Sequence, residues 1–428
     1  MFNLLSGVWA LLIGIVFIML GNGMHFTLIG LRGGIEGFSA TELSIVTSGY
    51  FLGFLSGAQL TPRMIQRVGH VRVFAALGSF MSAGLIAFPL FTDPWSWTIL
   101  RVLVGFCMSG VYVTAESWLN DATTNESRGK VLAAYMIAQT LGIIGAQALL
   151  TLGDAATATL FIAASILVSV SFGPILLSVT PVPATQVARP MSLIKLFKKS
   201  PLGTVGIFLL GGVYAAQSGM AAVFGSEIGL SADRIALLVA MLFGGALLLQ
   251  YPIGWLSDRM DRRKLIFGSA FLGATACGLG WTADDDYLLL LAAAFFAGGV
   301  TTPLYALFLA FTNDYLSTED MPAASGGLVF TFGLGAIAGP MVAGGLMGLI
   351  HPSAFWLALG GTFGMIAIYA LYRMTQRVGV DVEETESYLG VLPSASPVAV
   401  EAAGAWSAEQ AENERAEEAA NEETADRQ

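Results

Sequence analysis

Charged residues are scarce in this chain of 428 residues: 12% are Asp, Glu, Lys or Arg, against about 25% in a soluble domain. Hydrophobic residues make up 55%, so too little polar surface remains to cover a water-soluble protein of this size. The composition excludes an ordinary soluble domain. It indicates that lipid surrounds most of the chain, and apolar runs of about 20 residues should then recur.

Cysteine and histidine are also rare, with two and three copies. Cys107 and Cys277 lie far apart in apolar runs, which excludes a disulfide framework and favours two buried small side chains. The scattered histidines predict no metal site. Because the sequence holds neither a G-x-x-x-x-G-K-[ST] phosphate loop nor a catalytic constellation, we expect no enzyme, no ATP-driven pump, no cofactor and no nucleic-acid partner.

The net charge of −10 comes from one segment. Residues 379–428 hold 13 acidic residues against 2 arginines, so the rest of the chain is almost neutral. This segment is rich in Ala and Glu and poor in large apolar residues. We therefore expect an acidic, disordered tail.

Twelve apolar runs occupy most of the remaining sequence. They span residues 5–30, 43–62, 73–91, 96–119, 130–152, 155–180, 203–225, 234–257, 265–283, 287–312, 324–350 and 354–372. Only helices satisfy their own backbone groups as single spans in lipid, so we predict an all-α membrane protein with twelve transmembrane helices. The first run lacks a basic start and a cleavage site, which favours a membrane helix over a signal peptide.

Lysine and arginine are distributed unequally between the connections. One set of connections carries fifteen of them, whereas the other set carries only Arg32 and Arg234. Basic residues accumulate in cytoplasmic loops. The first set, and with it both termini and the tail, is therefore predicted to be cytoplasmic.

The two halves of the chain repeat one another. "QRVGHVR" at 66–72 aligns with "DRMDRRK" at 258–264, and "NDATTNES" at 120–127 aligns with "NDYLSTED" at 313–320. The offsets, 192 and 193 residues, are nearly equal. We predict a six-helix bundle over 1–180, a cytoplasmic linker over 181–202, and a second six-helix bundle over 203–378. Many secondary transporters are built from such duplicated halves.

"GWLSDRMDRR" carries a resemblance to a known family. It matches the G-x-L-x-D-R-x-G-R-R signature of the major facilitator superfamily through Gly254, Asp258, Arg259, Arg262 and Arg263. Asp261 replaces the second glycine, and the first half keeps only part of the pattern, with Arg67, Gly69 and Arg72. The resemblance implies a bacterial inner-membrane transporter, monomeric, working by alternating access. It also implies that the motif forms a cytoplasmic charge network that latches one conformation.

Two charges in the fourth run have no counterpart in the second half: Arg101 and Glu116. Ionisable residues at membrane depth indicate function by default. Arg101 either meets an anionic part of the solute or anchors its helix to neighbouring carbonyls. Glu116 either carries a proton or forms an ion pair at the helix end with Arg128 or Lys130.

Other polar residues in the apolar runs are candidates for the solute and proton pathway. For each of them, ordinary helix packing is the competing interpretation. They are His25, Tyr135, Gln139, Gln217, Gln250 and Tyr305.

A glycine-proline motif bears on the direction of transport. Drug exporters of the superfamily carry G-x-x-x-G-P-x-x-G-G in the fifth helix, but here the similar string is "GAIAGPMVAGG" at 335–345. This favours uptake of a small organic solute, and Glu116 as a proton carrier would make the uptake proton-coupled. The segment "ESWLN…RGK…AAY" resembles a bacterial branch of the superfamily that includes vitamin uptake, which implies a vitamin such as riboflavin as one candidate. The alternatives are efflux by proton antiport and a transporter-like sensor that acts through the acidic tail.

Overall fold

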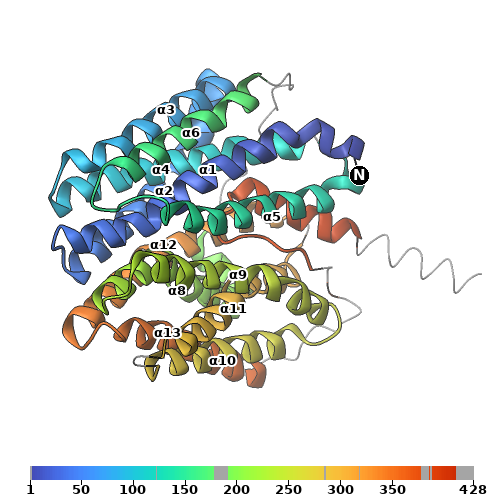
Figure 1. The fold of residues 1–428 in the computed structure, drawn as a ribbon. Coiled ribbons are helices and arrows are strands. Elements are labelled where there is room, and N and C mark those ends of the chain that lie inside the picture. Colours follow the sequence, from blue (N-terminus) through green and yellow to red (C-terminus); the bar gives the residue numbers. More distant parts are fainter. Residues whose placement is uncertain are drawn as a thin grey trace, which may run out of the picture.

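A computed structural model describes residues 2–121, 123–177, 191–283, 286–317, 319–376, 385 and 388–410. Every regular element among them is a helix (Figure 1). The long helices are α1 (Phe2–Ile35), α2 (Ala40–Val68), α3 (His70–Ala87), α4 (Pro94–Asp121), α5 (Asn125–Leu150), α6 (Thr159–Leu177), α8 (Pro201–Glu227), α9 (Ala232–Ser257), α10 (Arg262–Trp281), α11 (Tyr287–Asn313), α12 (Met321–Leu349) and α13 (Ala354–Gln376). Shorter helices are η1 (Phe88–Leu90), α7 (Leu193–Lys199) and a C-terminal helix over 397–410.

Each predicted apolar run falls on one long helix. In the described part of the chain, ten helices are long and apolar enough to cross a membrane. The other two are α6, which offers the shorter apolar stretch Thr159–Pro174, and α10, which opens with three basic residues. The prediction of an all-helical membrane protein is confirmed. The count of twelve spans and the orientation of the termini stay predictions.

Local sequence signals explain where several helices begin. Ser39 and Glu42 form a reciprocal capping box at the start of α2. Asp261 and Asp286 accept backbone N–H groups at the starts of α10 and α11. Pro201 begins α8, where its missing N–H costs nothing.

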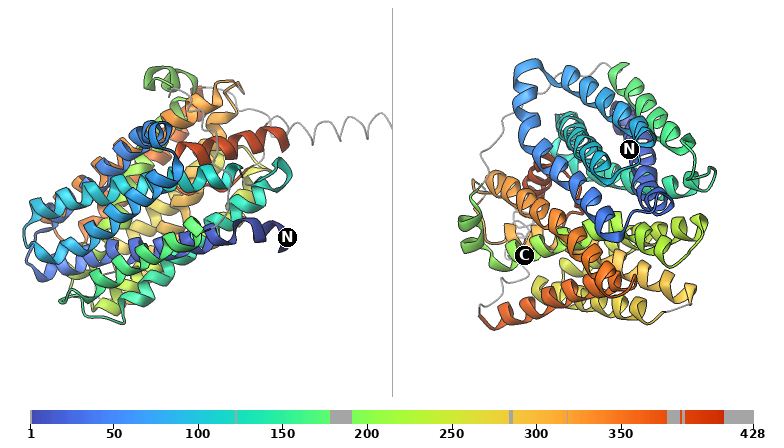
Figure 2. Two further views of the ribbon diagram at one scale, coloured as in Figure 1. Left: turned by 90° about the horizontal axis from the view of Figure 1, so that it is seen from above. Right: turned by 90° about the vertical axis from the view of Figure 1, so that its left-hand side faces the viewer.

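The helices form two groups. In the first, α2 packs on α4, α1 on α5 and α6, and α3 on α4 and α6. In the second, α9 packs on α11, α8 on α12, and α10 on α11 and α13. Figure 1 shows them as an upper blue-to-green group and a lower green-to-orange group, and Figure 2 shows the two groups from other sides. We call them the first and second bundles.

Glycines allow the closest helix contacts, and these contacts are duplicated. A Cβ atom on Gly53 would overlap the Val102 carbonyl of α4, and one on Gly105 would overlap the Tyr50 carbonyl of α2. In the second bundle, a Cβ on Gly245 would overlap the Phe295 carbonyl of α11, and one on Gly298 would overlap the Leu242 carbonyl of α9. The four residues of the first bundle correspond to the four of the second bundle at the same offset of 192 or 193 residues that relates the two halves of the sequence. The α2–α4 and α9–α11 pairs are therefore one packing unit built twice.

The two ends of the structure differ. We call the end where α2 passes into α3 and α9 into α10 the motif end, and the other the opposite end. At the opposite end the bundles touch directly: a Cβ on Gly30 would meet Ala222, and one on Gly344 would meet Ser44. Ser48 Oγ also donates to the Ile337 carbonyl at 2.8 Å. Small residues thus close the opposite end.

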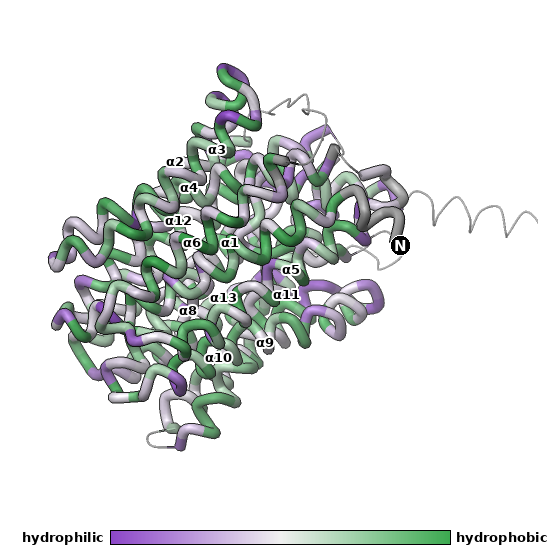
Figure 3. Tube along the Cα trace, turned by 45° about the horizontal axis from the view of Figure 1, so that its top comes forward, coloured by the Kyte–Doolittle hydropathy of each residue, from purple (hydrophilic) through white to green (hydrophobic). Residues whose placement is uncertain are grey.

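Hydrophilic residues gather toward the helix ends and connections, as Figure 3 shows. Part of the predicted linker, residues 191–202, is described and lies at the motif end. There Lys195 Nζ in α7 lies 2.9 Å from Asp320 Oδ1, at the start of α12. Residues 181–190 lie outside the described residues.

The prediction of a disordered tail is wrong for residues 388–410. Val391, Ala395, Ala399, Val400 and Ala403 are 4 to 8% exposed and pack into the core at the motif end. Small Ala and Val side chains fill a narrow space between helices, so the lack of large apolar residues was not evidence against packing. Residues 379–384, 386–387 and 411–428, also part of the predicted tail, lie outside the described residues.

The glycine contacts predict that one added methyl group will affect stability differently at two adjacent glycines of α9, Gly245 and Gly244. Gly245→Ala should lower the thermal unfolding temperature in detergent, because overpacking against a backbone carbonyl costs about 1–3 kcal/mol. Gly244→Ala is the matched control, since a Cβ there meets nothing within 4 Å. Equal unfolding temperatures for both variants would contradict the packing argument.

Candidate functional site

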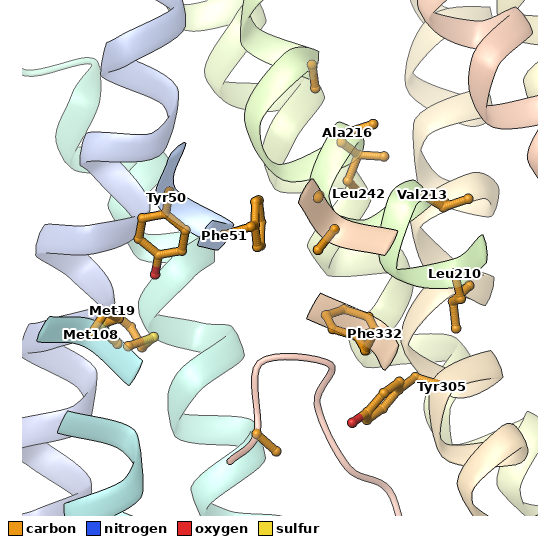
Figure 4. Packing of buried hydrophobic residues seen from close by; sticks show 14 of the residues in the cluster. Met19, Tyr50, Phe51, Met108, Leu210, Val213, Ala216, Leu242, Tyr305 and Phe332 are labelled. Atoms are coloured by element: carbon orange, nitrogen blue, oxygen red, sulfur yellow. The ribbon is translucent and has the colours of Figure 1, made fainter. Parts of the chain in front are cut away.

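A cavity lies between the two bundles. It is lined by residues of α1, α2, α4, α5, α8, α9 and α12, with Pro393 and Ser394 of the C-terminal segment. Figure 4 shows Tyr50 and Phe51 of the first bundle facing Phe332 of the second.

The cavity wall is aromatic and uncharged. None of the described residues that line it is Asp, Glu, Lys, Arg or His. Its polar groups sit between phenyl rings, and some are already paired: Thr27 Oγ1 donates to Gln147 Oε1 at 2.9 Å, and Asn22 Nδ2 donates to the Tyr50 hydroxyl at 3.4 Å. Such a wall can stack on a planar solute and hydrogen-bond its polar groups, but it offers no charge to a bare ion.

Arg101 and His25 meet behind this wall. Arg101 Nη1 lies 3.1 Å from His25 Nδ1, and the guanidinium carbon lies 4.1 Å from the Phe26 ring centre and 4.6 Å from that of Tyr50. Arginine can only donate, so Nδ1 is the acceptor and the ring is neutral, with its proton on Nε2. Both side chains are at most 1% exposed, so neither reaches the cavity directly. The pair joins α1 to α4, which replaces the predicted contact with backbone carbonyls.

Glu116 is buried at the motif end of α4, with 2% exposure. The Tyr135 hydroxyl donates to Oε1 at 2.9 Å, and the Ser396 backbone N–H donates to Oε2 at 2.8 Å. No salt bridge joins it to Arg128 or Lys130 among the described residues. A buried carboxylate with only neutral donors bears an uncompensated charge, which binding a proton would remove. Its role as a proton carrier stays a prediction.

Comparison with known proteins decides the family. The sequence profile of the Major Facilitator Superfamily matches residues 11–230 and 203–394. The chain belongs to the major facilitator superfamily. It is a membrane transporter and not an enzyme.

Its relatives include uncharacterized MFS-type transporters. The YcaD protein of Escherichia fergusonii is 25% identical over 342 residues, which cover 79% of this chain and 88% of the relative. The Ent638_1421 protein of an Enterobacter strain is 26% identical over 349 residues, with the same coverage.

Solved transporters share the fold. The nucleoside transporter NupG has a TM-score of 0.71 at 15% identity and covers 87% of this chain and all of its own. A D-xylose-proton symporter has a TM-score of 0.65 at 14% identity and covers 86% of this chain and 96% of its own. At these identities the likeness shows the superfamily fold alone.

The superfamily motif makes a network at the motif end. Arg262 Nη1 lies 2.5 Å from Asp314 Oδ1 at the end of α11, and both side chains are almost fully buried. Arg263 pairs with Asp261 at 2.6 Å, whereas Arg259 lies over the Trp255 ring. Asp258, which by the family resemblance should join Arg259 and Arg262 in a charge network, accepts the backbone N–H of Tyr388 at 2.8 Å.

Burial raises the pKa of Asp258, although the Tyr388 amide and the charges of Arg262 and Arg259 oppose this rise. Asp258 therefore interacts both with the C-terminal segment, through Tyr388, and with the arginines of the motif.

The first-half copy of the motif is weaker. Gly69 has φ +86°, a backbone conformation that favours glycine, and it joins α2 to α3. Asp261 holds the equivalent place with φ −53° and caps α10 instead. Arg67 and Arg72 are exposed and form no salt bridge within the described part of the chain.

The remaining predicted residues lie outside the cavity. Gln217 accepts from Thr301 Oγ1 at 2.9 Å and so ties α8 to α11. Gln250 Nε2 donates to the Tyr388 hydroxyl at 2.6 Å, and Gln139 lies beside Gly390 of the C-terminal segment. Tyr305 is fully buried against the Phe332 ring. None of these four lines the cavity, and their part in a solute or proton pathway stays a prediction.

No predicted site residue lines the cavity, and sequence reasoning did not single out the polar residues that do, among them Tyr112 and Ser394. Tyr112 stands one helical turn before Glu116, so its spacing from a predicted residue could have placed it on the same face. Ser394 carries no signal of this kind, because nothing local says that the chain returns to the cavity.

The buried ion pair predicts a large stability effect. Arg262→Met should lower the free energy of unfolding by about 3–5 kcal/mol, because it leaves the Asp314 charge buried without its partner. Lys195→Met breaks an exposed pair and should cost at most about 1 kcal/mol. Unfolding temperatures in detergent measure both, and an Arg262→Met, Asp314→Leu double variant should recover part of the loss.

Proposed function

We propose that the chain is a proton-coupled secondary transporter that takes up a small, uncharged organic solute with a planar ring and polar substituents. The observation that carries this proposal is the uncharged cavity, where tyrosine, asparagine and glutamine side chains stand among aromatic rings. Two proteins of similar fold support this class of solute and the coupling to protons. One is a nucleoside transporter and the other is a D-xylose-proton symporter. No relative reported above is named for a vitamin, so riboflavin has no particular support.

The proposed orientation follows the basic residues, with the motif end in the cytoplasm of a bacterial inner membrane. Since the opposite end is closed by small residues, the structure then corresponds to a transporter sealed from outside. Alternating access would require the two bundles to rock, as rigid units, about the cavity. The proposed working unit is one chain.

The proposed solute site can be tested with two similar glutamines. Gln147 lines the cavity and Gln217 does not, yet each accepts a hydrogen bond from a threonine at 2.9 Å. If the cavity binds the solute, Gln147→Ala should weaken binding roughly tenfold, the loss of about one hydrogen bond, and Gln217→Ala should not. Thermal-shift titrations with nucleosides, pentoses and riboflavin would supply the affinities, and equal effects of both substitutions would argue against this cavity.

Proton coupling can be tested at Glu116. Glu116→Gln keeps a hydrogen-bond acceptor for the Ser396 N–H but cannot carry a proton. In proteoliposomes, uptake driven by a pH gradient should fall to the undriven level, whereas solute exchange without a gradient should continue. An unchanged response to the gradient would remove Glu116 from the proton pathway. Accumulation of solute inside the proteoliposomes under an inward-directed proton gradient would indicate symport, whereas antiport would require an outward-directed proton gradient.

A further inference from the structure

The C-terminal segment, residues 388–410, enters the space between the bundles at the motif end. It contacts helices of both bundles there, whereas the opposite end closes through direct helix contacts. Figure 2 shows the red end of the chain lying against one end of the helices. The contacts of the segment occur at three successive places.

The first place is the superfamily motif of the second bundle. Tyr388 donates its backbone N–H to Asp258 at 2.8 Å, and its hydroxyl accepts from Gln250 Nε2 at 2.6 Å. Its ring lies against Gly254, where a Cβ would come within 2.7 Å of the ring. The motif glycine and aspartate therefore form part of a seat for this tyrosine.

The second place is the cavity itself. Pro393 and Ser394 form part of the cavity wall. Two residues later, the Ser396 N–H donates to Glu116 Oε2 of the first bundle at 2.8 Å, and Ser396 is 2% exposed. A hydrogen bond to a buried carboxylate is among the stronger ones available to a backbone amide.

The third place is the mouth of the motif end. The helix over 397–410 begins with Pro397, for which the first helical turn is favourable. The Trp406 indole packs on Gly129 of α5, where a Cβ would meet the ring at 2.7 Å, and Gly404 lies next to Asn313 of α11. This helix therefore spans the mouth from the first bundle to the second.

From these contacts we propose that residues 388–410 are an internal plug that occupies the motif-end mouth of the cavity and holds the bundles apart there. A solute cannot pass the plug, and the motif end cannot close on it, so the plugged transporter is inactive. Transport requires the segment to leave. The blocking of transport rests on the proposed function, whereas occupation of the mouth does not.

The test uses the full chain and two substitutions that act on the plug alone. Ser396→Pro removes the N–H that reaches Glu116, and Trp406→Ala removes the indole that packs on Gly129. The controls are Ser396→Ala, which keeps the N–H, and Trp95→Ala, which replaces a tryptophan that is 69% exposed.

The first readout needs neither solute nor proton. A cysteine is placed in the cavity wall by Ser218→Cys, and its labelling by a bulky, membrane-impermeant maleimide is timed in detergent; the native Cys107 and Cys277 are buried. The plug variants should label about tenfold faster than the controls, since each 1.4 kcal/mol lost from plug binding multiplies the open fraction by ten. Labelling at the control rate would overturn the proposal.

The second readout is solute exchange in proteoliposomes. Release of the plug should raise the exchange rate together with the labelling rate. Faster labelling with unchanged exchange would show that the segment fills the mouth but does not inhibit, which overturns the inhibitory part. Absence of exchange in every variant, with faster labelling in the plug variants, would count against the proposed solute class and leave the plug standing.

As a second route, Gly129→Leu leaves the segment intact but fills the seat of Trp406. It should speed labelling as Trp406→Ala does. Should the Ser396→Pro variant fail to fold, this pair still decides the matter, because equal labelling in Gly129→Leu, Trp406→Ala and the controls would refute the plug.

Discussion

The contact that organises this transporter is the close approach of α2 to α4 and of α9 to α11. At Gly53, Gly105, Gly245 and Gly298 the backbone of one helix lies where a Cβ would otherwise stand. In lipid no hydrophobic effect drives helices together, so dispersion between closely packed backbones must do so, and only small residues permit it. Each bundle is thereby held together by backbone contacts that leave no room for a side chain.

The open space in the structure lies at the boundary between the two bundles. The cavity lies there, and its polar groups come from both sides. Two charged residues of α4 do not line the cavity: Arg101 is held by His25 and two aromatic rings, and Glu116 is covered by Tyr135 and Ser396. The cavity wall is therefore neutral, while ionisable groups stand one layer behind it.

The superfamily motif makes two kinds of contact, one with the end of α11 and one with the C-terminal segment. Arg262 secures the end of α11 through Asp314, as a latch between helix ends would. Asp258 and Gly254, which carry the resemblance to the family, face the C-terminal segment instead. One short motif thus serves both the frame of the second bundle and the seat of a segment that follows the last long helix.

Much of this architecture was readable from the sequence. Long apolar runs predict helices, because a single span in lipid must satisfy its own backbone hydrogen bonds. The offset of 192 to 193 residues predicted the duplication that the glycine contacts display. The same periodic signals marked Arg101 and Glu116 as unusual, because each has no counterpart in the other half.

What the sequence could not determine is which distant groups meet. His25 and Arg101 are 76 residues apart, and Glu116 and Ser396 are 280 apart, so no local spacing joins them. The C-terminal segment shows this most plainly: its small side chains have little tendency to fold alone, and only the groove between two finished bundles gives them a surface to pack against.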